Sequence, residues 1–325
     1  MPAKKCSDKE FIEAFKRLGS PQQVSDYFQV DIRQVYRRRN KIEAAMGIVL
    51  TSHARDMTKR AKIELPRTGL RQIADIEGRV VVFGDAHWWP GQPKSTAHRA
   101  LLEIIRDISP AMIVANGDLL DLPSSSRHPP LGYGEHPTHD VAQEIAIVQE
   151  YLAEIEALAP RGCVLVYNLG NHDVRLAARI ASQAPELYNL KGMRLEDHFG
   201  AWGMGMSLML NGNIMIKHRP PRGGVHSSHG SIVASGLDAI VCNHLHALRI
   251  SPFTTYRRRR AYGVDAGCLA DFGPAQPQFN YTEDAPVGWA SGFAVLHIEQ
   301  GGAVRPPELC EVIEGRAYWR GEVVG

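Results

Sequence analysis

The sequence lacks the features of membrane, secreted and disulfide-bonded proteins. No apolar run is long enough to span a bilayer, and the first residues, MPAKKCSDKE, lack the apolar core of a signal peptide. The five cysteines form an odd, scattered set without a CxxC pair, which argues against a disulfide framework and against a cysteine-based zinc site. We therefore expect a globular protein of the cytoplasm with no membrane association.

A strong excess of charge of one sign is also absent. The formal net charge of +2 is too small to establish a polyanionic partner, so any such partner must be inferred from where the charges lie. With 325 residues, of which 44% are hydrophobic, the chain can bury a large core and has room for a second, small domain. We predict a small all-α domain over residues 1–48, a linker over 49–77 and a large α/β domain over 78–325.

Residues 1–48 are predicted to form three short helices. Pairs with the spacing of a capping box mark the helix starts: Ser7 with Glu10, Ser20 with Gln23, and Asp31 with Gln34. Only residues 29–31 separate the second helix from the third, which is the tight turn of a helix-turn-helix.

The third predicted helix is basic, and residues 1–45 hold ten Lys and Arg against six Asp and Glu. The unit resembles a helix-turn-helix DNA-binding domain. This resemblance implies DNA as a partner, contacted from the third helix. The residues expected to make the contacts are Arg33, Gln34, Arg37 and Arg38. A solvated helix face or a protein-docking bundle is the alternative.

Five short apolar runs in the rest of the chain are typical of buried strands, over residues 79–83, 112–115, 163–167, 214–216 and 239–242. Each is followed by carboxylate, amide or imidazole side chains. In chain order these are Asp85 and His87; Asp118 and Asp121; Asn171, His172 and Asp173; His218; and His244 and His246. Because open α/β sheets bind ligands at the carboxyl ends of their strands, we expect these side chains to share one site.

Taken in order, these motifs resemble those of the calcineurin-like metallophosphoesterases, and the resemblance covers roughly residues 79–300. It implies a two-sheet α/β sandwich flanked by helices, with two divalent metal ions that support phosphate-ester hydrolysis. The segment 121–123, Arg175 and the pairs at 288–289 and 292–293 look most like the metallophosphoesterases of bacteriophages and prophages.

The resemblance also implies a role for each motif residue. Asp118 would bridge the metals, the first site would be completed by Asp85, His87 and His246, and the second by Asn171, His218 and His244. His172 would act at the leaving oxygen as a general acid or charge stabiliser. Asp121 and Asp173 would hold the ligands in place from behind.

One feature of the sequence leaves the ligand set open to question, and one departure from the family pattern removes no ligand. His226 and His229 compete with His218 for the fourth motif, and we prefer His218 because it directly follows a predicted strand. The family commonly has Gly before the last His-x-His pair, whereas this chain has Asn243.

Imidazole, carboxylate and amide ligands favour Mn, with Fe or Zn as alternatives, over Mg. A helix-turn-helix fused to a phosphoesterase predicts a DNA nuclease or phosphodiesterase. Residues 257–260 are either further phosphate contacts or, equally, a solvated hairpin. One alternative is a small-molecule phosphodiesterase or phosphoprotein phosphatase with a docking N-terminus. Another is a DNA-binding regulator whose phosphoesterase domain is inert. The natural substrate, exo- or endonuclease action, DNA sequence preference and oligomeric state stay open.

Overall fold

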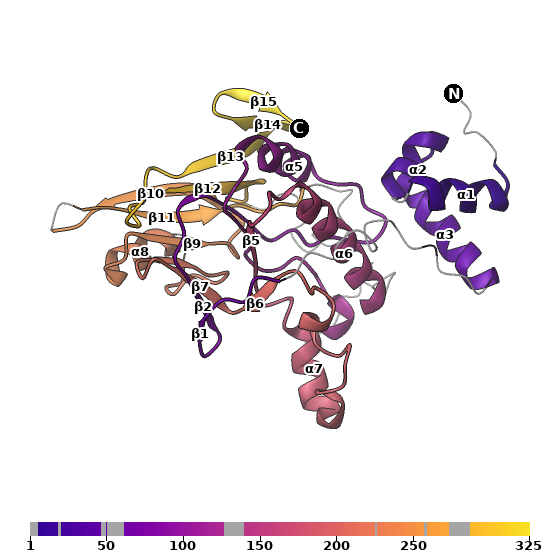
Figure 1. The fold of residues 1–325 in the computed structure, drawn as a ribbon, viewed down its shortest axis with the longest axis horizontal. Coiled ribbons are helices and arrows are strands. Elements are labelled where there is room, and N and C mark those ends of the chain that lie inside the picture. Colours follow the sequence, from indigo (N-terminus) through magenta and orange to yellow (C-terminus); the bar gives the residue numbers. More distant parts are fainter. Residues whose placement is uncertain are drawn as a thin grey trace.

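The computed structural model describes residues 6–18, 21–46, 50, 62–126, 140–224, 226–256, 259–272 and 287–325. In this part of the chain two mixed β-sheets pack face to face, and helices cover their outer faces (Figure 1). The predicted two-sheet α/β sandwich is thereby confirmed.

The larger sheet has eight strands in the order β15-β14-β13-β12-β3-β4-β5-β6. Their bounds are β3 Gly78–Phe83, β4 Met112–Ala115, β5 Val164–Asn168, β6 Gly203–Gly205, β12 Gly292–Ile298, β13 Glu308–Ile313, β14 Arg316–Trp319 and β15 Glu322–Val324. The neighbours β3, β4, β5 and β6 run parallel. The carboxyl ends of these strands therefore lie along one edge of the sheet, which is where open α/β sheets place their ligands.

The smaller sheet has seven strands in the order β1-β2-β7-β8-β9-β11-β10. Their bounds are β1 Arg67–Thr68, β2 Arg71–Ala74, β7 Ser207–Leu210, β8 Ile214–Ile216, β9 Ala239–Cys242, β10 Leu248–Thr254 and β11 Arg260–Ala266. Since β8 and β9 are parallel neighbours, the segments that follow them leave this sheet at the same edge.

Side chains alternate between the two faces of each strand and so pack into two hydrophobic cores. Val80 and Val82 of β3 point into the core between the sheets, whereas Val81 and Phe83 point into the core beneath the helices. That outer core is covered by α5, Thr96–Ile108, and α6, Val141–Leu158. Each large apolar side chain buried in this way contributes roughly 1.5–3 kcal/mol. The period of two therefore fixes which face of the strand meets which layer.

The remaining helices lie at the periphery. Helix α8, Ser227–Ser235, covers the outer face of the smaller sheet, where Ile232 packs against Ile240 and Ala261. Helix α7, Arg175–Gln183, buries none of its residues and extends away from the sheets (Figure 1). Among the helices that the structure describes, none has the length and apolarity needed to cross a membrane.

Three helices stand where the sequence predicts the N-terminal unit: α1 Asp8–Leu18, α2 Pro21–Phe28 and α3 Ile32–Met46. They have a core of their own, built from Phe11, Phe15, Val24, Phe28, Val35 and Ile42. At the start of α1 the predicted capping box is present, because Ser7 N donates to Glu10 Oε2 at 2.7 Å and Glu10 N donates to Ser7 Oγ at 3.2 Å. The assignment of this unit as a DNA-binding helix-turn-helix stays a prediction.

The sandwich begins earlier than the predicted boundary at residue 78. Strand β2 pairs in parallel with β7 and so belongs to the smaller sheet. Gln72 of β2 is fully buried, and its Nε2 donates to Gly203 O at 3.0 Å, which ties the strand to the larger sheet as well. Most of the predicted linker before β1, residues 51–61, lies outside the described residues.

His98 of α5 is a fully buried imidazole in the core beneath the helices. The centroid of its ring lies 5.3 Å from that of Trp88 and 4.9 Å from that of Tyr151. In the described part of the chain neither ring nitrogen has a hydrogen-bond partner. Burial, and after it the charges of Lys94 and Arg99, lowers the pKa of His98 well below its ordinary value. The imidazole is therefore neutral in the folded protein.

We expect His98→Phe to make the fold less sensitive to acid. The unfolded chain takes up a proton on His98 near pH ~6.5 and the folded chain does not, so stability falls as the pH drops below that value. The free energy of unfolding falls by up to about 1.4 kcal/mol per pH unit. Urea unfolding at about pH 7.5 and about pH 5.5 measures it. An equal pH-dependent loss in the wild type and the variant would contradict this account.

Candidate metal centre

Residues that follow β3 and β9 form the first candidate cluster. Asp85, His87 and His246 each offer one ligand atom, and these atoms lie within 4.8 Å of one another. His246 Nε2 lies 3.4 Å from Asp85 Oδ1, and His87 Nε2 lies 4.0 Å from the same oxygen. The structure therefore brings together the three residues expected to complete the first metal site.

A second cluster joins residues that follow β4, β8 and β9. Asp118, His218 and His244 offer ligand atoms within 4.8 Å of one another. His218 Nε2 lies 3.1 Å from Asp118 Oδ2 and 3.2 Å from Asn171 Oδ1, so the amide of Asn171 belongs to this group. These are the bridging residue and the second-site residues that the family resemblance implies.

The two clusters are contiguous. Asp85 Oδ1 of the first cluster lies 4.0 Å from His218 Nε2 of the second. His172 stands beside both, because its ring centroid is 4.8 Å from that of His87 and its Nε2 is 3.9 Å from Asp118 Oδ2. All the predicted ligands thus share one site at the carboxyl ends of the strands.

The backbone at this site is held in an uncommon conformation. Five candidate ligands have positive φ: Asp85 at 49°, His87 at 41°, Asp118 at 52°, His244 at 73° and His246 at 55°. Such left-handed backbone costs roughly 1–3 kcal/mol per residue outside glycine and persists only where the surroundings impose it. Strain gathered on the ligand set is typical of a functional site.

Local hydrogen bonds impose this conformation. His87 N donates to Asp118 O at 3.1 Å, and Asp85 N donates to Gly117 O at 2.9 Å, so the segments after β3 and β4 hold each other. His244 N donates to Asp85 Oδ2 at 2.8 Å, which links the two sheets through a candidate ligand. The strained turns are therefore fixed by one another.

Asp121 and Asp173 contact candidate ligands from behind, and Asp121 also groups with His87 and His172 as a further possible metal-binding cluster. Asp121 Oδ1 is 3.1 Å from His87 Nδ1 and 2.8 Å from His172 Nδ1. The Asp173 carboxylate accepts from Asp118 N and Gly170 N, both at 2.8 Å. It therefore anchors the loop that carries Asp118, while Asp121 leaves the Nε2 atom of His87 facing the site.

A chain of buried amides beneath the centre was missed by the sequence analysis. Asn168 Nδ2 donates to Asn116 Oδ1 at 2.9 Å, and Asn116 Nδ2 donates to Asn243 Oδ1 at 2.8 Å. Asn243 Nδ2 then donates to Gly267 O at 2.9 Å. The Asn243 that departs from the family pattern therefore completes a link between the two sheets. The available signal was an Asn at or next to the end of three predicted strands.

Arg175 was also missed as a neighbour of His172. Its Nη1 donates to Asp121 O at 2.7 Å, and its Nη2 lies 3.1 Å from His172 Nε2. A guanidinium has only donors, so in this contact Nε2 of His172 is the acceptor. Arg175 thus orients the imidazole that is expected to act at the leaving oxygen.

The charges of the centre favour the metal-binding protonation state in some candidate ligands and oppose it in others. Burial would raise the pKa of Asp118, but the imidazoles of His218 and His172 prevail and lower it. Burial opposes the charged form of His218, yet Asp118 and then Asp85 raise its pKa to about 9. Burial, and after it the charge of His218, lowers the pKa of His244 to about 4. Ionised carboxylates and a neutral His244 are suited to ligate a cation, whereas His218 must release its proton when a cation binds.

Other sequence candidates lie elsewhere. His226 and His229 are exposed and belong to none of the clusters, so the structure places His218, and neither of them, beside Asp118. In the basic run at 257–260 the first two residues lie outside the described part. Arg259 pairs with Asp238, and Arg260 Nη1 donates to Thr254 Oγ1 at 2.9 Å.

Comparison with known proteins identifies the family. The model of the calcineurin-like phosphoesterases matches residues 78–248, more than half of the 325 residues. The chain belongs to the calcineurin-like phosphoesterase family. It is a metal-dependent hydrolase of phosphate esters.

Relatives and similar structures are distant. The Gene 54 proteins of Mycobacterium phages D29 and L5 are 27% and 26% identical over 244 residues, which cover 69% of this chain and 91% of each phage protein. Vps29 of Entamoeba histolytica complexed with zinc is 13% identical, with 75% of this chain and 98% of that chain covered and a TM-score of 0.40. The nuclease MPE of Pseudomonas putida is 14% identical, with 74% and 86% covered and a TM-score of 0.31.

The donor set of this phosphoesterase fits divalent cations. Carboxylate, imidazole and amide oxygen converge from both sheets, and His218 Nδ1 is bound to Asn116 O at 2.9 Å, which leaves Nε2 to face the centre. The chemistry that such ions supply in phosphoesterases is Lewis-acid activation of the phosphate and of water. The residues around them orient the substrate and handle the protons.

Gly170→Ala should weaken metal binding. A Cβ at Gly170 would collide with the side chain and the backbone nitrogen of Asp118, so Asp118 must shift. Displacing a ligand through its neighbour typically costs about 10- to 100-fold in metal affinity. Titration with Mn²⁺ followed by calorimetry measures the change. Gly200→Ala is the matched control, because nothing lies within 4 Å of its added Cβ. Unchanged affinity in a folded Gly170→Ala protein would place Asp118 outside the metal centre.

Asp118→Asn and His172→Ala should have different effects. Because Asp118 stands in the ligand cluster, its isosteric amide should lose bound metal and activity together. His172→Ala should retain the metal and lower kcat by roughly 10²- to 10⁴-fold, the typical contribution of a general acid. Metal content by mass spectrometry, beside kcat on a chromogenic diester, separates the two. An empty His172→Ala protein would show that His172 is a ligand.

Proposed function

We propose that the protein hydrolyses phosphodiester bonds in DNA with two divalent ions, Mn in preference to Fe or Zn. The observation that carries the proposal is the exposed basic face of α3, attached to a phosphoesterase centre with a complete donor set. Imidazole and carboxylate ligands in this mixture suit Mn, Fe or Zn better than Mg. The cytoplasmic location expected from the sequence stays a prediction.

The predicted contact residues of α3 differ in their exposure. Gln34, Arg37 and Lys41 are exposed on the helix. Arg38 instead holds the start of the unit, because its Nη2 donates to Asp8 Oδ1 at 2.8 Å and to Cys6 O at 2.6 Å. The side chain of Arg33 lies outside the described residues. Arg37 and Lys41 are therefore the side chains best suited to phosphate contacts, and Arg38 serves to hold the unit together.

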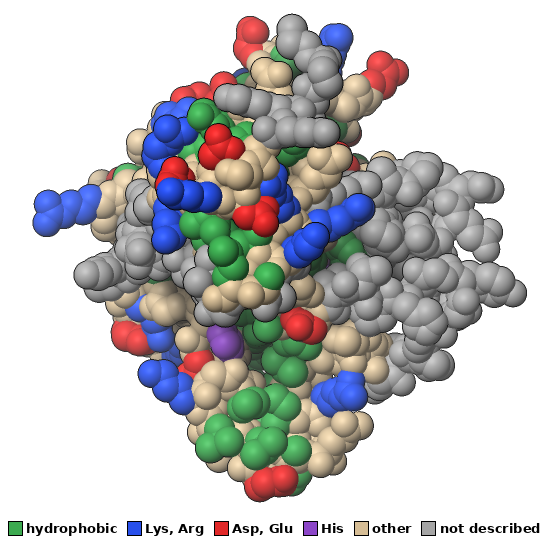
Figure 2. All heavy atoms as spheres, turned by 90° about the vertical axis from the view of Figure 1, so that its right-hand side faces the viewer, with side chains coloured by type: hydrophobic (Ala, Val, Ile, Leu, Met, Phe, Trp, Pro, Cys, Tyr) green, Lys and Arg blue, Asp and Glu red, His purple; other side chains and the backbone are tan. Residues whose placement is uncertain are grey.

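Charge on the face that includes α1 to α3 supports binding of a polyanion. Figure 2 shows Lys and Arg side chains gathered on the upper part of this face, with acidic side chains among them. Contacts of this kind go to phosphates and carry no sequence information. The proposed role of the N-terminal unit is therefore to deliver the enzyme to DNA without preference for a base sequence.

The N-terminal unit also contacts the phosphoesterase domain of its own chain. Tyr36 of α3 packs against the core beneath the helices of the phosphoesterase domain. Burial, and after it the charge of Glu150 on α6, raises the pKa of Tyr36 well above its ordinary value. The second hypothesis, a small-molecule phosphodiesterase or phosphoprotein phosphatase whose N-terminal unit docks a partner, has no contact of this kind among the described residues in its favour. An inert phosphoesterase domain is disfavoured by the complete donor set.

Replacing Arg37 and Lys41 together by Gln should weaken action on long DNA. For every phosphate that the variant no longer neutralises, the slope of log affinity against log salt should fall by about one. Hydrolysis of bis(p-nitrophenyl) phosphate should respond to salt far less, because a small diester does not reach α3. Binding of a duplex and kcat/KM on both substrates, over a range of salt concentrations, measure this.

Lys9→Gln is the matched control, because Lys9 is an exposed cation on α1 and not on α3. It should leave the salt slope on DNA unchanged. If the double variant lost activity equally on DNA and on the small diester, α3 would support the fold of the enzyme. If it lost activity on neither, the docking hypothesis would be favoured.

A further inference from the structure

A hollow of about 890 Å³ opens beside the candidate metal ligands Asn171 and His244. Among the described residues that line it, three are arginines and none is a carboxylate: Arg175, Arg179 and Arg219. A concave surface with uncompensated positive charge attracts anions, and the charges act more strongly there than on an open surface. The hollow is therefore suited to an anionic group that is larger than a water molecule.

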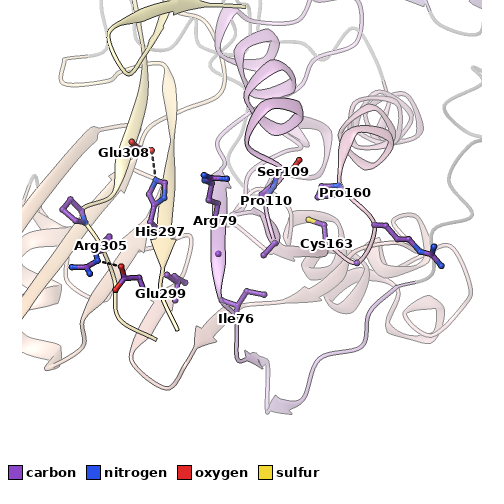
Figure 3. Close-up of a pocket in the computed structure, with 16 residues that line it drawn as sticks. Ile76, Arg79, Ser109, Pro110, Pro160, Cys163, His297, Glu299, Arg305 and Glu308 are labelled. Carbon is purple, nitrogen blue, oxygen red and sulfur yellow. Dashed lines mark hydrogen bonds and ion pairs between the residues drawn. The ribbon is translucent and has the colours of Figure 1, made fainter. Parts of the chain in front are cut away.

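The hollow at the opposite end of the strands differs in this respect. It has a volume of about 870 Å³ and also contains arginines. Figure 3 shows that two of its charged side chains face partners of opposite sign: Arg305 contacts Glu299 and His297 contacts Glu308, both at 2.6 Å. Volume alone therefore does not distinguish the two hollows, whereas the absence of carboxylates from the described lining beside the metal centre does.

Helix α7 gives the hollow its length. Five of its residues line the hollow with the spacing of one helix face: Arg175, Ala178, Arg179, Ser182 and Gln183. At 1.5 Å per residue the helix advances roughly 12 Å between the first and the last. One strand of B-form DNA advances about 3.4 Å per phosphate along its axis, so this face is long enough for more than one phosphate.

The three arginines that line the hollow differ in the hydrogen bonds that they make within the protein. Arg175 is held by Asp121 O and lies against His172, and Arg179 donates to the uncharged Ser124 O and Gln183 Oε1. Arg219 is exposed and makes no hydrogen bond or ion pair that involves another described residue. Arg219 can therefore bind an anion without giving up a partner, and Arg179 retains an unneutralised charge.

Phosphate, and not base, is the group that this lining can recognise. Binding of bases without sequence preference usually uses aromatic side chains as stacking platforms. Apart from the imidazole of His244, the described lining has no ring, and it consists of arginine, serine, amide and small apolar side chains. Arginine binds phosphate through paired N–H donors.

We propose that this hollow is a subsite for a phosphate that flanks the scissile diester, with Arg219 and Arg179 as its specificity-determining residues. The inference rests on the proposed phosphodiesterase function and narrows its substrate class to chains that carry at least two adjacent phosphates. An isolated diester fills the metal centre alone and leaves the subsite without a ligand.

Two trinucleotides that differ in one charge test the subsite. Thymidine trinucleotide carries two phosphates, and its analogue carries an uncharged methylphosphonate in place of the flanking one. With Mn²⁺-loaded protein, kcat/KM should be at least about tenfold higher for the charged compound, as expected for hydrogen bonds to a charged group. Fluorescence anisotropy of labelled versions should show the same preference in binding, independently of cleavage.

In Arg219→Gln the ratio between the two trinucleotides should fall toward one, and Arg179→Lys, which keeps the charge, should retain more of it than Arg179→Gln. Because each ratio compares two substrates on one protein, a general loss of folded enzyme cancels. Arg316→Gln is the matched control: Arg316 is an exposed cation on β14, at the opposite end of the molecule from α7 (Figure 1). Its ratio should equal that of the wild type.

The outcomes separate the two proposals. If neither trinucleotide is cleaved but the charged one still binds more tightly, in a manner that depends on Arg219, the subsite stands and the phosphodiesterase proposal fails. If both are cleaved and bound equally well, the subsite is overturned and the phosphodiesterase proposal stands. A ratio unchanged in Arg219→Gln would likewise overturn the assignment of the subsite to this hollow.

Discussion

The position of Asp118 is the constraint on which the rest of the site depends. Its Oδ1 accepts from His172 N at 2.8 Å, and its Oδ2 lies 3.1 Å from His218 Nε2. Its backbone has positive φ and is held by Asp173. A buried carboxylate is costly unless cations or donors surround it, so the surrounding elements must bring donors to this point. The Cβ-free Gly170 that touches Asp118 is one consequence of this crowding.

The two sheets are joined at the same place. Apolar packing between sheets is non-directional and would tolerate small shifts, whereas ligand atoms from both sheets must meet within a few ångströms. The amide chain from Asn168 through Asn116 to Asn243 supplies directional contacts across this boundary. Each of these buried groups would cost about 1–3 kcal/mol if it were left unpaired. The network therefore penalises any slip of one sheet past the other that would separate the ligands.

The sequence was informative about the candidate site residues that directly follow the ends of strands. Strands β4 and β9 have the predicted bounds, and the polar residues after them lie together because parallel strands end at one edge. The sequence was uninformative about strands and side-chain contacts that depend on residues far away in the chain. Strand β2 is short and joins the sandwich by pairing with β7, a partner more than a hundred residues away. The engagement of Arg38 by the start of α1, and the contact of Arg175 with His172, depend on rotamers that no local pattern encodes.

The small net charge is compatible with a polyanionic substrate because positive and negative side chains are unevenly distributed over the protein. In the hollow at the far end of the strands, for example, Arg305 is neutralised by Glu299. Uncompensated cations remain on α3 and along the hollow beside α7, and these are the surfaces proposed to bind DNA and the flanking phosphate. Attraction falls off within about 10 Å at ordinary salt, so a distant acidic patch does not cancel a basic hollow. Affinity for a phosphodiester chain is therefore set by local charge, and the net charge of the whole protein is a poor guide to it.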